Sequence, residues 1–266
     1  MSAVPQTENE PILLRRDDNG IATLTLNRPN QFNSLSKAML TELQAALDAI
    51  AQDSSVRVVI IAGAGKAFCA GHDLKEMRSN HTKEFQQALF RQCAKVMMTI
   101  TEIPQPVIAR VHAIATAAGC QLVSMCDLAV ASDVARFAVS GINVGLFCSA
   151  PAVGLSRNIS RKQAMEMLLT GDFIDARTAL AHGLVNRVVP LDQLDLEVGK
   201  LAGAIVAKSA VAIAMGKQMF YKQSEMGLDA AYQYAGEVMA CNMMTDDVAE
   251  GIDAFAEKRK PQWKGR

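Results

Sequence analysis

The sequence has no excess of charge of either sign. Its 266 residues include 27 Lys and Arg against 27 Asp and Glu, so the formal net charge is zero. Neutralising the phosphates of DNA or RNA requires a clear excess of Lys and Arg. We therefore expect no nucleic acid among the partners of this chain.

Long apolar runs are missing too. A membrane-spanning helix needs about 20 apolar residues in succession, whereas runs such as residues 58–61 are far shorter. The first eleven residues are polar and include two acids, so they fit neither a signal peptide nor an Arg-rich transit helix. We expect a cytoplasmic protein with no membrane among its partners.

Cysteine and histidine lack the spacings of a metal site. No two of the six cysteines form a C-x-x-C pair, and the four histidines lie far apart. Scattered cysteines in a large, Met-rich chain indicate reduced side chains in a core or pocket. The sequence therefore predicts no metal site. These residues are Cys69, Cys93, Cys120, Cys126, Cys148 and Cys241, with His72, His81, His112 and His182.

Hydrophobic periodicity predicts alternating strands and helices up to residue 190. Residues 22–26 alternate with the period of a half-buried strand, and Ser36 is a predicted N-cap for a helix with one apolar face. The β-branched segments 57–62 and 107–111 predict strands buried on both faces. Strand, loop and helix units in this order predict an α/β fold. Further predicted elements are helices at 85–100, 119–126 and 175–183, and strands at 128–131 and 185–189.

The composition changes after Pro190. Residues 191–266 contain no convincing strand, are rich in Ala, Met, Lys and Glu, and end in a basic run. We predict an α/β body over residues 1–190 and a helical region over 191–266.

Five motifs resemble landmarks of the enoyl-CoA hydratase/isomerase family, the crotonases. Residues 67–77 (AFCAGHDLKEM) and 117–127 (AAGCQLVSMCD) are similar to its two signatures. Matches at 26–35, 171–174 and 255–260 follow the family's order, so the resemblance covers nearly the whole chain. Agreement of five motifs in register is improbable by chance.

The resemblance implies a spiral of ββα units with a C-terminal helical region that mediates trimers, often paired into hexamers. It implies an acyl-CoA thioester as partner, with coenzyme A as part of the substrate and no separate cofactor. The family stabilises the enolate-like oxyanion of the thioester with two backbone N–H groups. Matched position by position, these amides belong to His72 and Ala118.

The loops themselves support this assignment. Backbone amides in a loop are free of sheet pairing, and Gly71 permits an unusual turn at low cost. Small residues at 117–119 let a thioester approach the backbone, and a helix from Gly119 would direct its positive end at the carbonyl. Taken alone, the small residues favour mere tight helix packing. The resemblance implies that Phe255 and Lys258 reach the CoA of a neighbouring subunit. The full set of substrate-binding residues that it implies is Lys66, Ala70, Gly71, Asp73, Gly119, Phe255 and Lys258.

Both glutamates with which typical family hydratases add water are missing. The matching positions hold Gln121 and Gly141, and neither an amide nor a hydrogen can transfer a proton. We therefore doubt two-glutamate hydration and predict that Gln121→Glu with Gly141→Glu raises crotonyl-CoA hydration.

Other residues offer replacement chemistry. The imidazole of His72 titrates near neutral pH, although it could instead point to solvent or brace Asp73. Gln121 either orients water or substrate or packs in its helix. Cys148 and Ser149 could act as nucleophiles, but no nearby histidine in the sequence activates them.

These observations predict an acyl-CoA-processing enzyme of fatty-acid or related metabolism. Hydratases, isomerases, hydrolases and decarboxylases share this scaffold, so the reaction is left open. The alternative from another class is a non-catalytic CoA-ester-binding protein, which the missing acids favour and the retained oxyanion loops oppose.

Overall fold

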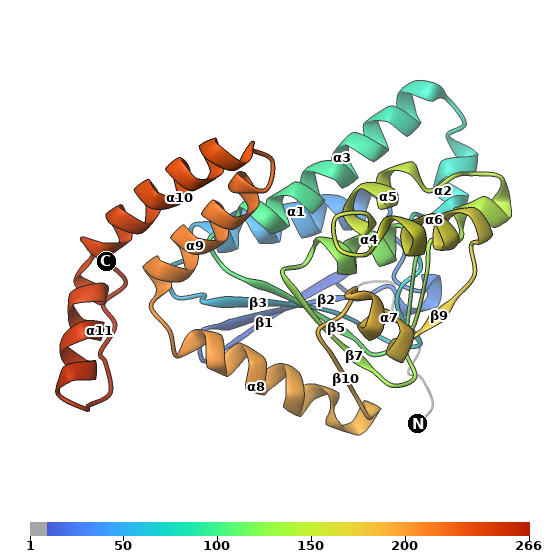
Figure 1. Cartoon of the computed structure of the whole chain (residues 1–266). Helices are drawn as coiled ribbons and strands as arrows, with labels where there is room; N and C mark the ends of the chain where they lie inside the picture. The colour runs from blue at the N-terminus through green and yellow to red at the C-terminus, as the bar shows by residue number, and fades with distance from the viewer. Residues whose placement is uncertain (1–9) are drawn as a thin grey trace.

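The computed structural model describes residues 10–266 and contains two sheets surrounded by helices (Figure 1). The larger sheet has the order β1-β2-β3-β5-β7-β10, with β1 antiparallel to β2 and the other pairs parallel. Its strands are β1 Leu13–Asp18, β2 Ile21–Leu26, β3 Val58–Gly63, β5 Val107–Val111, β7 Leu128–Ser132 and β10 Arg187–Val189. The prediction about the first eleven residues falls almost entirely on residues 1–9, outside the described residues.

Short strands form the second sheet, in the order β4-β6-β8-β9. They are β4 Ala67–Cys69, β6 Ile114–Thr116, β8 Arg136–Ala138 and β9 Ile174–Asp175. The pairs β3/β4, β5/β6 and β7/β8 each give one strand to either sheet and are each followed by helix. Those helices are α2 Leu74–Ser79 with α3 Lys83–Glu102, then α4 Ala118–Met125, then α5 Ser149–Leu155. This is the predicted spiral of ββα units.

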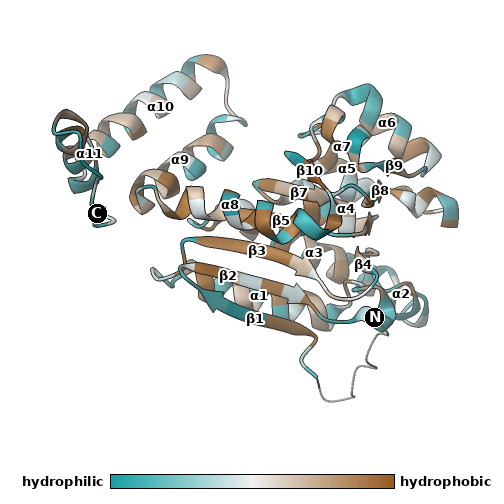
Figure 2. Cartoon of the chain, turned by 90° about the horizontal axis from the view of Figure 1, so that it is seen from below, coloured by the Kyte–Doolittle hydropathy of each residue, from teal (hydrophilic) through white to brown (hydrophobic). Residues whose placement is uncertain are grey.

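Strand β3 is buried on both faces, as predicted. Val59 and Ile61 belong to the main core, to which α1 (Lys37–Ala51) and α3 contribute, whereas Val58 and Ile60 pack in a separate cluster with α8 (Leu194–Val206). Figure 1 shows α1 and α3 on one side of the sheet and α8 on the other. Figure 2 shows β3 hydrophobic along its length and the edge strand β1 largely hydrophilic.

Two helices begin at the N-terminal capping residues that the sequence offers. Ser36 Oγ accepts a hydrogen bond from the Met39 amide at 3.2 Å and begins α1. Asp175 accepts from the Thr178 amide at 2.7 Å and begins α7 (Ala176–His182), which ends at Gly183 with φ +87°. Both helix starts were predicted because Ser and Asp side chains satisfy the unpaired amides of a first turn.

After β10, helices account for all regular structure in the described chain. Helices α9 (Ala210–Gln223), α10 (Leu228–Met243) and α11 (Asp246–Ala256) extend from the end of the sheet opposite α2 and α5 (Figure 1). The division at residue 190 stays a prediction. Within residues 10–266 no single helix is long and apolar enough to cross a membrane; the segments 191–206 and 210–223 reach that length and composition only together, with a 103° bend between them.

Helix α9 is held to the body by a buried ion pair. Lys217 Nζ donates to Asp127 Oδ2 at 2.7 Å and to the carbonyl oxygens of Ile100 and Gln105, both at 2.8 Å. The Tyr221 hydroxyl donates to Asp127 Oδ1 at 2.8 Å. The side chain of Lys217 is only 7% exposed. Asp127, which lies directly before β7, therefore has a structural role in joining α9 to the body.

We expect Lys217→Met to lower the free energy of unfolding by about 3–5 kcal/mol, since it leaves a buried carboxylate and two carbonyl groups without their cation. Arg157→Met is the matched control, because its ion pair with Glu225 is exposed and contributes at most about 1 kcal/mol. Urea denaturation at one protein concentration measures both. Equal losses in the two variants would contradict the anchoring role.

Candidate active site

Two loops meet at Gly71. This glycine follows β4 with φ +89°, a conformation that residues with a side chain rarely adopt. A Cβ atom placed on it would lie 2.8 Å from Ala117 Cβ and 3.1 Å from the Ala118 nitrogen. The absence of a side chain therefore lets the loop after β4 lie directly against the start of α4.

Ala117 makes the turn into α4 with φ 51° and ψ −122°. Positive φ in a non-glycine residue costs of the order of 1–3 kcal/mol and persists only where its surroundings enforce it. Here the Ala117 amide donates to the Ala138 carbonyl at 3.0 Å, and its own carbonyl accepts from the Gln121 amide at 3.1 Å. The turn therefore fixes the direction of the next amide, that of Ala118.

The amides of His72 and Ala118 donate no hydrogen bond to any residue in the described range 10–266. Most buried backbone amides have a partner, and Ala118 is only 1% exposed. The neighbouring Leu35 amide, by contrast, donates to the Gly71 carbonyl at 2.7 Å, which holds the first loop in place. Two adjacent loops thus each offer one unused donor, an arrangement that can bind a developing oxyanion.

Both donors border a cavity of about 300 Å³ between these two loops, α2, α3 and α5. Its wall is mostly apolar, and none of its lining residues is an acid, a lysine or an arginine. The titratable side chains among them are His72 and Cys148. The lining residues are Ala70, His72, Leu74, Met77, Phe90, Ala117, Ala118, Ser140, Gly141, Val144, Leu146, Phe147, Cys148, Ser149, Ala150 and Pro151.

The His72 ring packs between a carbonyl group and an aromatic ring. Its Nδ1 lies 3.2 Å from the Leu35 carbonyl oxygen, and its ring centre lies 5.6 Å from that of Phe90 in an edge-to-face arrangement. Burial lowers the pKa of His72, against smaller opposing effects of the Leu35 carbonyl and Glu76. The imidazole is therefore predominantly neutral at pH 7.

Gly141 lines the cavity, but there is no room for a side chain on it. A Cβ atom would lie 2.5 Å from the Leu146 carbonyl oxygen and 2.8 Å from Cys148 Sγ. The Gly141 amide donates to this sulfur at 3.3 Å, and burial raises the pKa of the Cys148 thiol. A glutamate at 141 therefore does not fit this loop conformation, because the chain after Gly141 occupies the space. This counts against the gain in hydration expected of Gln121→Glu with Gly141→Glu.

Gln121 and Gly119 lie on α4 outside the cavity lining. Gln121 is 5% exposed, and its Oε1 atom is buried with no hydrogen-bond partner among the described residues. A Cβ on Gly119 would overlap the backbone of Cys69 in β4. Gly119 therefore permits close packing of α4 against β4, which is the alternative role that we considered for the small residues at 117–119.

Asp73 and Lys66 also lie outside the cavity lining. Asp73 caps α2 by accepting from the amides of Lys75 and Glu76, and it forms an ion pair with Arg28 at 3.1 Å. Burial alone would raise the pKa of Asp73, but these hydrogen bonds and the Arg28 charge outweigh it and lower the pKa. Lys66 is an exposed residue between β3 and β4.

Phe255 and Lys258 lie at the end of the helical region. Phe255 is 87% exposed on α11, and Lys258 follows that helix with φ 56°. In Figure 1, helix α11 lies on the opposite side of the molecule from α2 and α5. The structure therefore brings together Ala70, His72, Ala118 and Gly141, with Gly71 between the two loops, but not these tail residues.

The apolar wall of the cavity was not predicted. Leu74, Met77 and Val144 come from short segments with no regular pattern, and Phe90 lies off the buried stripe of α3. An aromatic residue on the less buried side of an amphipathic helix was the available signal for Phe90.

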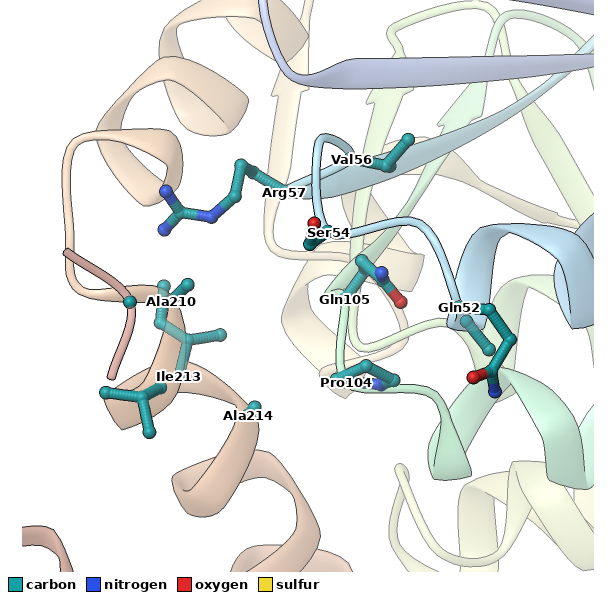
Figure 3. A pocket seen from close by; sticks show the side chains of 12 residues that line it. Gln52, Ser54, Val56, Arg57, Pro104, Gln105, Ala210, Ile213 and Ala214 are labelled. Atoms are coloured by element: carbon teal, nitrogen blue, oxygen red, sulfur yellow. The ribbon is translucent and has the colours of Figure 1, made fainter.

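A second cavity, of about 370 Å³, lies between residues 51–57, the turn at Pro104 and α9 (Figure 3). The one charged residue in its lining, Arg57, donates to the Lys208 carbonyl at 2.6 Å. The lining holds no carboxylate, imidazole or thiol, so this cavity lacks the groups needed for proton transfer. Within residues 10–266, no group of three or more His, Cys, Asp or Glu residues is placed to hold a metal ion.

The sequence matches the family model for enoyl-CoA hydratase/isomerase over residues 16–266. The chain belongs to this family. A Mycobacterium smegmatis crystal structure described as enoyl-CoA hydratase has a TM-score of 0.94 and 59% identity, and covers 96% of this chain and 99% of that one. The crystal structure of human enoyl-CoA hydratase domain-containing protein 3 has a TM-score of 0.93 and 45% identity, covering 95% and 100% of the two chains.

Relatives in the family differ in what their names state. Enoyl-CoA hydratase domain-containing protein 3 of Mus musculus, named mitochondrial, is 45% identical over 97% of this chain and 86% of its own length. A probable enoyl-CoA hydratase of Mycobacterium tuberculosis is 36% identical over 97% and 99%. The cytoplasmic location expected for this chain stays a prediction, and it differs from the location in the first name.

We expect Gly141→Glu to lower the free energy of unfolding by about 1–3 kcal/mol, the usual cost of overpacking, and not to raise crotonyl-CoA hydration. Gly203→Glu is the control, because Gly203 is exposed on α8 with no atom near its missing Cβ. Urea denaturation and an absorbance assay of hydration measure the two effects. A stable Gly141→Glu variant with increased hydration would contradict this expectation, because it would show that the loop after Gly141 shifts at little cost to make room for the side chain.

Proposed function

We propose that this family member binds an acyl-CoA thioester in the apolar cavity and processes it through an enolate. The thioester oxygen lies between the amides of His72 and Ala118, and the acyl group lies against the apolar wall. The pair of unused amides beside this cavity is the observation that carries the proposal. Such preorganised donors contribute roughly 3–4 kcal/mol each to stabilising an oxyanion.

Two-glutamate hydration is the reaction least supported by these residues. Water addition in that manner needs one group to activate water and another to protonate carbon. The cavity lining contains no carboxylate, and position 141 has no room for one. We therefore favour isomerisation or another thioester reaction that needs fewer proton-transfer groups, with hydrolysis and decarboxylation as the alternatives.

A non-catalytic CoA-ester-binding protein is the second candidate. The same absence of carboxylates favours it, since binding needs the amides and the wall but no acid or base. The strained turn at Ala117 favours the enzyme instead, because a fixed donor stabilises charge that develops during a reaction.

The remaining parts of the proposal concern CoA and assembly. We expect the helical region to form trimers, or dimers of trimers, through its exposed apolar side chains. These include Phe220, Leu228, Tyr232, Met239, Met244 and Phe255. In such an assembly, Phe255 and Lys258 reach the CoA of a neighbouring subunit, and Lys66 approaches the CoA of its own. No separate cofactor is part of the proposal.

Incubation with a panel of saturated, enoyl and carboxylated CoA thioesters, followed by mass spectrometry, tests the function. We expect binding of apolar acyl thioesters and conversion of at least one of them to an isomeric or otherwise altered product. Binding without any product would favour the non-catalytic candidate. Absence of binding to the whole panel would contradict the proposal.

Gly71→Ala tests the oxyanion site. The added methyl group meets Ala117 and the Ala118 amide, so we expect at least about 100-fold slower turnover, as for loss of one oxyanion donor. Gly183→Ala is a close control, because Gly183 has φ +87° and its missing Cβ has no contact nearer than 3.4 Å. Both variants bear the cost of positive φ, so equal activity of the two would contradict the role of the loop contact.

A further inference from the structure

The imidazole of His72 has one nitrogen committed and one free. Nδ1 lies 3.2 Å from the Leu35 carbonyl oxygen, which can only accept a hydrogen bond. The proton of the neutral ring therefore resides on Nδ1. Nε2 keeps its lone pair and has no hydrogen-bond partner among the described residues. In many catalytic histidines the hydrogen bond made by one ring nitrogen decides the tautomer in this way and leaves the other nitrogen available for the reaction.

The ring is also held in position. Phe90 packs against it edge to face at 5.6 Å, and both residues line the cavity. The Leu35 segment is itself fixed, because the Leu35 amide donates to the Gly71 carbonyl at 2.7 Å. The backbone of His72 thus supplies one oxyanion donor while its side chain presents a base beside the same cavity.

The other polar side chains of the cavity lining are poor bases. Ser140 shares a hydrogen bond with Thr116 at 2.7 Å, and Ser149 lies 3.4 Å from the Phe147 carbonyl. Burial raises the pKa of the Cys148 thiol, which keeps it protonated at neutral pH. His72 is therefore the group in this lining that is suited to accept a proton from carbon.

We propose that Nε2 of His72 removes and returns the proton on the acyl carbon next to the thioester carbonyl, so that the chain catalyses proton shifts without adding water. This inference rests on the proposed function, since it requires the thioester oxygen between the two amides. The reaction class that follows is enolisation of acyl thioesters and movement of the double bond in enoyl thioesters.

The step balances without a further reactant. The C–H bond next to the carbonyl breaks, and its electron pair forms the carbon–carbon double bond of the enolate. Negative charge collects on the thioester oxygen, and the proton bonds to Nε2. Return of the proton to the same carbon restores the thioester. In a 3-enoyl thioester, its return to the carbon at the far end of the conjugated system gives the 2-enoyl isomer.

Exchange of the C2 protons of butyryl-CoA in deuterium oxide, followed by NMR, tests this step directly, because a saturated thioester cannot be hydrated. His72→Asn is the decisive variant. Its side-chain amide nitrogen is placed to replace Nδ1 as donor to Leu35, and its backbone amide remains, but the basic Nε2 is lost. We expect at least about 100-fold slower exchange, the usual minimum effect of removing a general base.

Three accompanying measurements separate catalysis from folding. His72→Ala, which also loses the Leu35 bond, should slow exchange to the same extent, and added imidazole should partly restore it. His81→Asn alters an exposed histidine between α2 and α3 and should leave exchange unchanged. Calorimetry should show that His72→Asn binds butyryl-CoA within a few-fold of the unaltered protein.

The pH dependence gives a readout that a structural role would not change. The base must be neutral, so the exchange rate should rise with pH through the imidazole pKa and then level. Burial lowers that pKa, and the opposing groups are the Leu35 carbonyl and the Glu76 carboxylate of α2. Phe90 of α3 is uncharged, and the Cys148 thiol at the start of α5 also lines the cavity. This limb should disappear in His72→Asn.

Each outcome decides the question. Slow exchange in His72→Asn with preserved binding supports the inference. Unchanged exchange in that variant, or binding without any exchange in the unaltered protein, overturns it while the thioester site stands. No binding of butyryl-CoA by the unaltered protein overturns the proposed function itself.

Discussion

The close approach of two backbone loops at Gly71 is the constraint on which the site depends. A Cβ atom added to Gly71 would lie 3.1 Å from the Ala118 nitrogen, so the loop after β4 lies directly against the turn into α4. Neither loop alone provides two donors. The second sheet, which contains only short strands, pairs β4 with β6 and thereby brings the two loops to one place.

The cavity beside these loops explains which chemistry the scaffold supports. An apolar wall strengthens the field of the two amides, because little water competes for the bound oxygen. The same wall makes an unpaired carboxylate costly to bury. A neutral imidazole is compatible with such surroundings, since it can remain uncharged until it accepts a proton.

Much of the fold was predictable because its signals are local. The alternating residues of β2, the apolar runs of β3 and β5, and the caps Ser36 and Asp175 all act within a few residues. Strands β4, β6 and β8 were not predicted, since three residues are too few to show a period of two. Strand β1 was missed because its sequence, LLRRDD, has no alternation and most of it is exposed at the sheet edge.

The site was predictable only in part. The glycine and small residues at 71 and 117–119 marked the loops, and their order along the chain marked the family. No sequence signal indicated that Gly119 packs on Cys69, that Leu146 fills the space beside Gly141, or that Leu35 fixes the His72 tautomer. The contacts of Gly119 and His72 join residues that are distant in sequence, and the contact of Gly141 depends on the path of the loop over residues 141–146. Only the three-dimensional structure shows them.

The most direct measurement of the central claim is the infrared carbonyl stretch of butyryl-CoA labelled with carbon-13 at the thioester carbonyl. If the amides of His72 and Ala118 both donate to this oxygen, the bound stretch will lie at lower frequency than in water. A bound thioester whose carbonyl frequency equals or exceeds that in water would contradict the account.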